Sequence, residues 1–292
     1  MERNKSSATL RCDLHTHSVF SDGTYTPRQL IAQAKQLDLI LALTDHNTVS
    51  GLPEFMAAAR EFGVTAVPGA EISTEYNGTE LHLLGLFIMP EHYAAIDWMV
   101  KEQHILKEIS NMELVERLNR AGYLIDYATI KKRIPNGNAN RAHIAAELLA
   151  CGYVTSVHEA FDTILSDKGD FYVPPARLQL LDVIREFRHI GVLPVLAHPL
   201  QELTEQALRA LLPAAIEAGL LGMETMHSSY TSEMISRAEA IATEYNLLPS
   251  GGSDFHGSVK PDIALGVGSG QLCIPARVYS DLLAAAAQAG TK

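Results

Sequence analysis

The sequence predicts an α/β fold built on a parallel sheet, with a helical segment inserted between two parts of that sheet. Two observations carry this prediction. Short apolar runs, such as residues 39–44, have the length and composition of strands buried on both faces, and helical patterns separate them. Between about residues 90 and 173 this alternation stops and long helical patterns replace it. Because strand–helix alternation is typical of parallel sheets with right-handed crossovers, we predict one α/β domain with an insertion.

The first part of the α/β domain is predicted over residues 8–90. Its first helix begins after Thr26, a favoured N-cap residue, with Pro27 at the first helical position. Its second helix is stopped by Gly63. The pattern opens with a strand from Leu10, the predicted helices cover residues 27–37 and 52–62, and the later predicted strands cover residues 39–44, 64–67 and 80–87.

The second part of the α/β domain is predicted over residues 173–290, where the alternation resumes. The predicted strands cover residues 192–197, 221–226 and 247–250, and the predicted helices cover residues 180–189, 205–218, 232–245 and 277–287. In parallel α/β folds the chemistry lies just beyond the carboxyl ends of the strands. The residues that follow these strands are therefore the candidate functional residues.

The insertion is predicted over residues 91–172, with helices over residues 94–121, 141–150 and 156–165. A basic, turn-rich connection over residues 131–140 joins the first two helices. We interpret the insertion as a helical cap packed over the mouth of a barrel. The alternative is an elaborated segment of the barrel itself.

Composition excludes several classes of protein. The 292 residues carry a formal net charge of -11, which argues against a surface that binds polyanions such as double-stranded DNA. Three cysteines without close spacing predict neither a disulfide framework nor a cysteine-based zinc site. The N-terminal residues resemble no signal peptide, and no apolar run is long enough to span a membrane. We therefore expect a cytoplasmic protein that does not bind membranes.

Histidines and acids gather at the predicted strand ends. His15 and His17 are two residues apart, so in an extended strand both side chains point to the same side. Seven histidines lie in or just after predicted strands: His15, His17, His46, His82, His198, His227 and His256. Asp22, Asp45, Glu71 and Asp254 join them. Imidazole and carboxylate ligands suit Zn, Mn or Fe, and so many of them predict two or three divalent ions.

Seven short motifs in order resemble one family. They are D-L-H-T-H-S, S-D-G, T-D-H, P-G-A-E, L-H-L-L-G, A-H-P and G-S-D-F-H. Together they resemble the PHP (polymerase and histidinol phosphatase) superfamily of metal-dependent phosphoesterases. This resemblance implies a distorted TIM-like (β/α)7 barrel. The insertion resembles the small helical cap of a subgroup that acts on nucleoside 3',5'-bisphosphates and on the 5' ends of short RNA.

The family pattern implies three metal positions. The first would be held by His15, His17, Glu71 and Asp254. Glu71 would bridge to a second ion, completed by His82 and His198. The third would be held by Asp22, His46 and His256, and Asp22 stands where some members have histidine. This departure puts the affinity or metal preference of the third position in doubt.

The predicted chemistry is hydrolysis by a hydroxide that bridges two ions, giving orthophosphate and an alcohol directly. Asp45 or His227 would supply a proton to the leaving oxygen, and Asp45 would alternatively orient an imidazole. Arg141 and His143 begin a predicted helix, where a phosphate can bind. Arg177 is a further candidate for binding a second phosphate of the substrate.

The leading hypothesis is a phosphatase that removes the 3'-phosphate from nucleoside 3',5'-bisphosphates, such as adenosine 3',5'-bisphosphate. A 5'-3' exoribonuclease acting on short 5'-phosphorylated RNA is the first alternative. Histidinol-phosphate phosphatase and a non-catalytic metal-binding module follow. A metal-dependent amidohydrolase ranks last, because its bridging lysine has no evident counterpart. The native metal, the base preference and the oligomeric state stay open.

Overall fold

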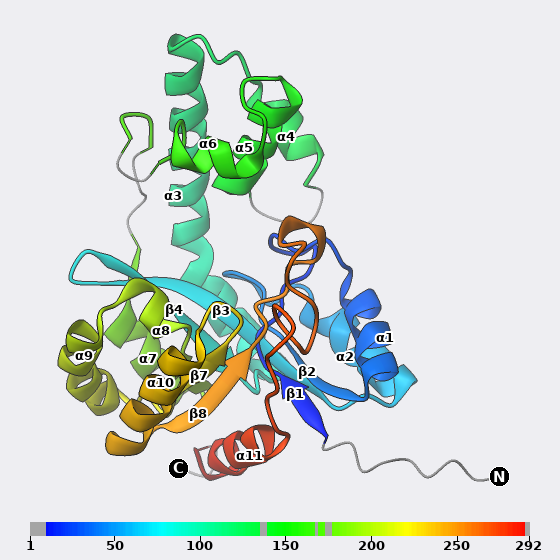
Figure 1. The fold of residues 1–292 in the computed structure, drawn as a ribbon, viewed down its shortest axis with the longest axis vertical. Helices are drawn as coiled ribbons and strands as arrows, with labels where there is room; N and C mark the ends of the chain where they lie inside the picture. The colour runs from blue at the N-terminus through cyan, green and yellow to red at the C-terminus, as the bar shows by residue number, and fades with distance from the viewer. Residues whose placement is uncertain (1–9, 135–138, 167–168, 173–176, 290–292) are drawn as a thin grey trace. The chain divides into compact units, whose positions relative to one another are not determined.

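The computed structural model describes residues 10–134, 139–166, 169–172 and 177–289. The chain divides into two compact units (Figure 1). The first unit combines Met1–Asp97 with Leu178–Lys292, and the second is Trp98–Arg177. No helix in the described ranges has both the length and the hydrophobicity needed to cross a membrane.

A single sheet forms the centre of the first unit. Its hydrogen-bonded order is β1 (Arg11–Asp13), β2 (Leu39–Leu43), β3 (Ala66–Tyr76), β4 (Thr79–Leu86), β6 (Leu193–Leu196), β7 (Gly222–His227) and β8 (Leu248–Gly252). The short β5 (Leu178–Gln179) pairs with the far end of β3. The chain after β1 meets the chain after β8, because the Leu14 N–H donates to the Gly251 carbonyl at 3.1 Å. The sheet is therefore a nearly closed barrel.

One strand runs against the others. β4 pairs antiparallel with both β3 and β6, whereas the remaining neighbours in the barrel are parallel. The prediction of a parallel sheet is therefore wrong for this strand. The cause is a tight turn at Asn77 and Gly78, whose φ angles of 50° and 79° are those of a two-residue hairpin. Asn-Gly between two strand patterns signals such a hairpin from sequence.

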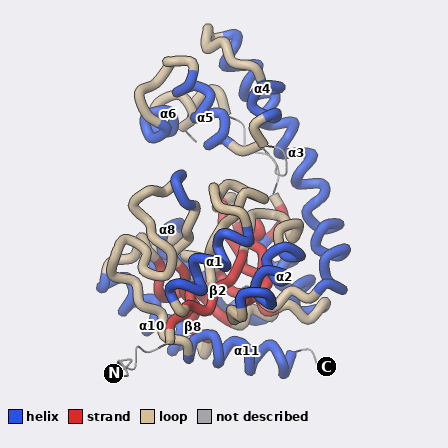
Figure 2. The backbone as a smooth tube through the Cα atoms, turned by 90° about the vertical axis from the view of Figure 1, so that its right-hand side faces the viewer, coloured by secondary structure: helices blue, strands red, loops and turns tan. Residues whose placement is uncertain are grey.

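Helices surround the sheet (Figures 1 and 2). They are α1 (Pro27–Leu37), α2 (Leu52–Phe62), α7 (Leu180–His189), α8 (Pro199–Glu202), α9 (Glu205–Ala218), α10 (Ser232–Glu244) and α11 (Arg277–Ala289), with short 3₁₀ turns at Pro90–His92 and Gly257–Val259. The predicted start of α1 is confirmed, because Thr26 and Gln29 form a reciprocal capping box. Gly63, with φ of 65°, ends α2 as predicted.

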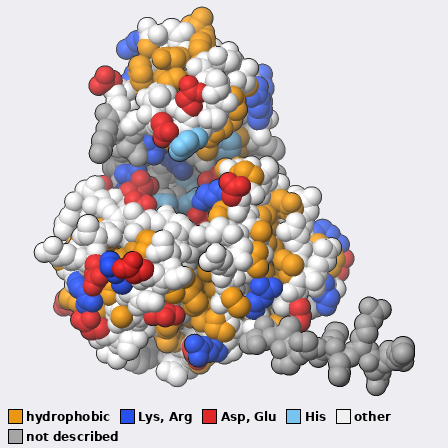
Figure 3. All heavy atoms as spheres, viewed as in Figure 1, with side chains coloured by type: hydrophobic (Ala, Val, Ile, Leu, Met, Phe, Trp, Pro, Cys, Tyr) orange, Lys and Arg blue, Asp and Glu red, His pale blue; other side chains and the backbone are white. Residues whose placement is uncertain are grey.

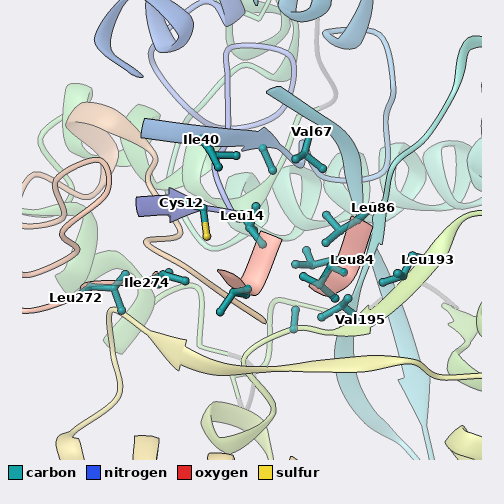
Figure 4. Packing of buried hydrophobic residues seen from close by; sticks show 14 residues of the cluster. Cys12, Leu14, Ile40, Val67, Leu84, Leu86, Leu193, Val195, Leu272 and Ile274 are labelled. Carbon is teal, nitrogen blue, oxygen red and sulfur yellow. The ribbon is translucent and has the colours of Figure 1, made fainter. Parts of the chain in front are cut away.

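Alternate residues of the strands fill the barrel interior (Figure 4). Cys12 and Leu14 belong to the first strand and the residues after it, and Leu84 and Leu86 lie on β4. Side chains two residues apart share one face of a strand, so this spacing directs each pair inward. His82 has the same parity as Leu84 and Leu86. It therefore points toward the inside of the barrel, at the amino end of an antiparallel strand, where the neighbouring parallel strands have their carboxyl ends.

A buried carboxylate helps to close the barrel. Asp13 accepts hydrogen bonds from the Ser253 N–H at 2.8 Å, the Ser253 hydroxyl at 2.6 Å and the Gly266 N–H at 2.8 Å. It is completely buried. The side chain thus ties the end of β1 to the segment after β8 and to a loop near the C-terminus.

Replacing Asp13 by alanine is expected to lower the free energy of unfolding by about 3–5 kcal/mol, because buried N–H groups would lose a charged acceptor. Urea denaturation of the metal-free protein measures this change. Asp13→Asn keeps an acceptor oxygen and should lose less. The exposed Asp182, replaced by alanine, is the control. A loss within the control's range would contradict the assigned role.

The second unit is helical and has its own core. It contains α4 (Tyr127–Lys132), α5 (Arg141–Ala150), α6 (Val157–Asp162) and most of α3 (Tyr93–Arg120). Its core includes Leu114, Leu118, Ile144, Leu148 and Leu165. Sequence analysis missed α4, which Asp126 caps and which includes part of the predicted basic connection. Residues 135–138 of that connection and 173–176 beside the predicted domain boundary lie outside the described residues. The assignment of this unit as a cap stays a prediction.

Candidate metal centre

The structure brings the predicted histidines and acids of the first unit together at one end of the barrel. They follow β1, β2, β6 and β8 or lie within β3, β4 and β7. The gathered side chains are those of His15, His17, Asp22, His46, Glu71, His82, His198, His227, Asp254 and His256. Most of them are buried. Residues far apart in the sequence therefore form one polar cluster.

Glu71 lies at the centre of this cluster, and its two oxygens face different histidines. Oε2 is 3.1 Å from His15 Nε2, 3.3 Å from His17 Nε2 and 3.1 Å from His46 Nδ1. Oε1 is 2.8 Å from His82 Nδ1 and 3.1 Å from His198 Nε2. A carboxylate whose oxygens face two sets of imidazoles is placed to bridge two metal positions.

Two aspartates complete the cluster. Asp254 Oδ1 is 3.2 Å from His17 Nε2 and 3.7 Å from His15 Nε2. Asp22 Oδ1 is 3.2 Å from His256 Nε2, and its Oδ2 is 3.9 Å from His46 Nε2. Five groups have ligand atoms within 4.8 Å of one another: His17/Asp22/His46/His256, His15/Glu224/His227, His15/Glu71/His198, His15/His17/Asp254 and His46/Glu71/His82.

The backbone at the site is constrained. His198 and Asp254 have φ angles of 26° and 55°, in the left-handed region that residues other than glycine rarely adopt. Such conformations gather at functional sites, where the surrounding structure holds them. Gly252 leaves the room that His15 needs, because a Cβ at this glycine would lie 2.2 Å from the His15 Cβ.

Burial and opposite charge act against each other in the cluster. Burial alone would raise the pKa of Glu71, but the charges of His46 and His15 hold it well below its usual range. Burial alone would lower the pKa of His82, but Glu71 raises it to about 10. The carboxylates therefore stay ionised and require positive charge beside them.

The donor set fits divalent metal ions. Buried ring nitrogens, including His46 Nδ1, His82 Nδ1 and both nitrogens of His17, lack a hydrogen-bond partner within the described part of the chain. A buried polar atom without a partner costs free energy. An ion held by imidazole and carboxylate would satisfy these nitrogens and supply the positive charge that the acids require.

Glu224, on β7, is a member of the site that sequence analysis missed. Its Oε1 lies 3.1 Å from His15 Nδ1, and its Oε2 accepts a hydrogen bond from the His198 N–H at 2.7 Å. The side chain is completely buried. Because a carboxylate at Nδ1 favours the tautomer with the hydrogen on that atom, Glu224 leaves His15 Nε2 free to bind a metal. The sequence did carry a signal for this role, because Glu224 is an acidic residue in the middle of the predicted strand 221–226.

Asp45 has contacts other than the predicted ones. Its Oδ1 accepts from the Ser18 N–H and from the Ser21 hydroxyl, both at 2.7 Å, and its Oδ2 accepts from the Ser18 hydroxyl at 2.6 Å. These contacts anchor the segment that follows His17. The predicted catalytic role of Asp45 stays a prediction.

The predicted substrate residues lie apart in the sequence from the cluster. The Arg141 guanidinium lies over the Tyr172 ring at 4.1 Å and donates to the Leu165 carbonyl at 3.3 Å. His143 Nδ1 accepts from the Asn140 N–H at 3.1 Å and so caps α5. Both belong to the second unit, and Arg177 ends it. The contacts of Arg141 and His143 help to hold this unit together, and substrate binding by Arg141, His143 and Arg177 stays a prediction.

A barrel with imidazole and carboxylate ligands gathered at the carboxyl ends of its parallel strands defines a metal-dependent hydrolase. The family model described as the PHP domain matches residues 13–173, and the chain belongs to this family. It is a metal-dependent phosphoesterase, and relatives that cover most of its length are named as a phosphatase, exoribonucleases and a phosphodiesterase.

Three relatives show the range of named activities. The chain is 31% identical to a 5'-3' exoribonuclease of Haemophilus influenzae over 250 residues, covering 85% of this chain and 90% of the relative. It is 29% identical to a 3',5'-nucleoside bisphosphate phosphatase of Chromobacterium violaceum over 254 residues, covering 84% and 86%. It is 31% identical to a phosphoribosyl 1,2-cyclic phosphate 1,2-diphosphodiesterase of Eggerthella lenta over 257 residues, covering 84% and 94%.

Solved structures support the fold. A Bifidobacterium adolescentis protein described as a metal-dependent phosphoesterase superposes with a TM-score of 0.83 at 29% identity, covering 96% of this chain and 97% of that one. A Chromobacterium violaceum protein described as an amidohydrolase with bound sulfate superposes with a TM-score of 0.81 at 27% identity, covering 94% and 96%.

Proposed function

We propose that this phosphoesterase removes the 3'-phosphate from nucleoside 3',5'-bisphosphates and releases a nucleoside 5'-phosphate and orthophosphate. The central position of Glu71 between two sets of imidazoles supports the phosphoesterase chemistry. The likeness to the Chromobacterium violaceum bisphosphate phosphatase supports the substrate. On the face drawn in Figure 3, basic and acidic side chains are interspersed, an arrangement that suits a small substrate better than a long polyanion.

The ligand sets that we propose follow the observed distances. His15, His17, Glu71 and Asp254 would hold one ion, Glu71 with His82 and His198 a second, and Asp22, His46 and His256 a third. Divalent ions bound there would activate water for attack on phosphorus and offset the charge of the phosphoryl oxygens. Glu224 orients His15, and Asp13 fixes the end of the strand that leads to it.

A second candidate is a 5'-3' exoribonuclease, which the likeness to the Haemophilus influenzae enzyme favours. Both candidates break the bond between phosphorus and O3' of a 5'-phosphorylated nucleoside. They differ in whether the attacked phosphorus carries a further nucleotide. One site can therefore serve either reaction, and substrate size decides between them.

A direct comparison of substrates tests the proposal. The manganese-loaded protein is given adenosine 3',5'-bisphosphate, short 5'-phosphorylated oligoribonucleotides and histidinol phosphate, and both orthophosphate and mononucleotides are measured. We expect the highest kcat/KM for the bisphosphate, with AMP as the product. Efficient release of mononucleotides from the oligomers would support the second candidate, a 5'-3' exoribonuclease, over the bisphosphate phosphatase. Activity on histidinol phosphate alone would overturn both candidates.

Removal of the metal is expected to abolish activity and to lower thermal stability. Without divalent ions, the buried acids and imidazoles of the cluster lose the charge that satisfies them. Treatment with a chelator followed by dialysis, then by stepwise addition of Mn²⁺, measures both effects. Activity and melting temperature should recover together as the ions bind. Full activity in protein shown by elemental analysis to be metal-free would contradict the prediction.

The predicted role of Arg141 needs a separate test. If Arg141 binds the second phosphate of the substrate, Arg141→Lys should raise KM for the bisphosphate by about tenfold and leave KM for an aryl phosphate unchanged. Arg141 also packs on Tyr172, so the melting temperature must be measured beside the kinetics. Equal changes in KM for both substrates would show that Arg141 does not bind the second phosphate.

A further inference from the structure

His227 differs from the other histidines of the cluster in what its ring nitrogens contact. Nδ1 lies 3.2 Å from the backbone nitrogen of Ser229, 2.9 Å from the side-chain amide nitrogen of Gln201 and 2.9 Å from the Ser229 hydroxyl, which can donate to it. A backbone N–H can only donate, so Nδ1 accepts. We therefore assign the hydrogen of the neutral ring to Nε2.

Gln201 strengthens this assignment. Its amide nitrogen also lies 2.6 Å from the Ser229 hydroxyl, so one NH₂ group donates to both neighbours. Gln201 is in α8, directly after the strand that leads to His198. The amide of Gln201 is therefore a hydrogen-bond donor on the Nδ1 side of the His227 ring.

The opposite nitrogen of His227 is left for a ligand. Nε2 has no hydrogen-bond partner in the described residues, and the side chain is 2% exposed. The nearest carboxylate oxygen, Asp254 Oδ2, is 3.6 Å away, which is too long for an ordinary hydrogen bond. A nitrogen that carries a hydrogen cannot bind a metal. Nε2 is therefore a buried donor rather than a metal ligand, although His227 lies close to His15 and Glu224.

A positive charge adjoins the same carboxylate oxygen. The Lys260 ammonium lies 2.6 Å from Asp254 Oδ2, and its side chain is 40% exposed. The other oxygen of Asp254, Oδ1, faces His17 and His256. Asp254 thus separates a side with metal ligands from a side with two donors, one neutral and one cationic.

We propose that the His227 Nε2–H and the Lys260 ammonium form an oxyanion subsite that holds oxygens of the substrate phosphoryl group beside the metal ligands, with Gln201 positioning His227. This proposal rests on the phosphoesterase activity and not on the identity of the nucleotide. His227 donates a hydrogen bond and keeps its hydrogen, because loss of that hydrogen from a neutral ring would leave an imidazolate. In this proposal His227 does not give a proton to the leaving oxygen, although the sequence analysis predicted that role. It stabilises the negative charge of the phosphoryl oxygens through a hydrogen bond.

The tautomer is tested without any reaction. Nitrogen-15 NMR of histidine-labelled protein, in metal-free and zinc-loaded forms, distinguishes the two neutral tautomers, and His227→Asn assigns the signal. We expect the Nε2–H tautomer in both forms. The Nδ1–H tautomer, or a zinc-dependent shift that shows ligation through Nε2, would overturn the proposal.

Phosphate affinity tests Lys260. Inorganic phosphate serves as the probe, with its inhibition constant measured on the manganese-loaded enzyme and metal content measured in parallel. Lys260→Met should weaken phosphate binding about tenfold without changing the metal content, and Lys260→Arg should retain most of the affinity. Lys35→Met, which changes an exposed lysine on α1, is the control. Unchanged phosphate affinity, or a loss of metal in Lys260→Met, would refute the subsite.

The kinetics separate donation from positioning. His227→Asn should lower kcat about 10²–10³-fold, as loss of an oxyanion donor does elsewhere. Gln201→Leu should also lower kcat and weaken the Nε2–H signature, and the double variant should add little to His227→Asn alone. His189→Asn, at the exposed end of α7, is the control. Additive effects would reduce Gln201 to a structural role and overturn its assignment. If oligoribonucleotides proved the better substrates, only the proposed nucleotide substrate would fail.

Discussion

Glu71→Gln is expected to lower kcat about 10³-fold or more and to remove at least one metal ion from the purified protein. The carboxylate faces three imidazoles through Oε2 and two through Oε1, so it lies between two sets of candidate metal ligands. Glutamine has nearly the same shape but offers one oxygen and no charge. A bridging position therefore loses several kcal/mol of charge stabilisation while the packing is preserved.

Elemental analysis and steady-state kinetics check this expectation together. Glu75→Gln, four residues further along β3 and partly exposed, is the matched control and should keep both metal and activity. A Glu71→Gln protein with a full metal complement and near-normal kcat would refute the bridging role. Loss of activity with the metal content unchanged would show that Glu71 acts on the substrate instead.

Much of this site was predictable because its residues follow strands. His15, His46 and Asp254 come just after short strands, and parallel strands bring their carboxyl ends to one edge. The position of a residue directly after a strand therefore predicts that it lies near the residues that follow the other parallel strands. The short parallel strands and helices of the first unit were found for the same reason, since burial and capping leave a local pattern in the sequence.

The direction of β4 was not recovered, although its signal was local. The Asn77-Gly78 turn makes β3 and β4 a hairpin, and Glu71 consequently lies inside an 11-residue strand rather than after a short one. The antiparallel direction also brings His82 to the same edge from the opposite end of its strand. A prediction that considers only the carboxyl ends of strands therefore misses the position of His82. Recognising β3 and β4 as a hairpin is needed to place it at the correct edge.

Other residues of the site could not be predicted, because their roles depend on contacts across the fold. Lys260 reaches Asp254 from a turn six residues further on, and nothing in its spacing marks it. Gln201 acts on His227 across 26 residues of chain. Arg141, which was predicted to bind phosphate, packs on aromatic rings of its own unit, a contact that its spacing did not indicate, and its phosphate binding stays a prediction. The local sequence can indicate that a side chain is able to bind an anion. It does not indicate which group that side chain contacts in the folded protein.

Glu224→Gln is expected to lower metal affinity and activity about 10–100-fold, although the substitution is nearly isosteric. Glu224 receives two donors, the His15 Nδ1–H and the His198 N–H. Glutamine has one oxygen and one NH₂ group, so in either orientation its NH₂ meets a nitrogen that needs an acceptor. If the NH₂ faces His15, it forces the hydrogen onto Nε2, the atom that faces Glu71, and His15 can no longer bind a metal through it.

If the NH₂ faces His198 instead, two donors meet in a fully buried position, and the strained loop that carries His198 loses its hydrogen bond. Metal titration, followed by kinetics at saturating Mn²⁺, separates the two consequences. Excess metal should restore activity in the first case, whereas the second should also lower the melting temperature. Glu217→Gln, an exposed glutamate on α9, should behave as wild type. A Glu224→Gln protein with normal metal affinity and normal stability would mean that Glu224 does not orient His15, and the tautomer that makes Nε2 a ligand would have to be set by the metal itself.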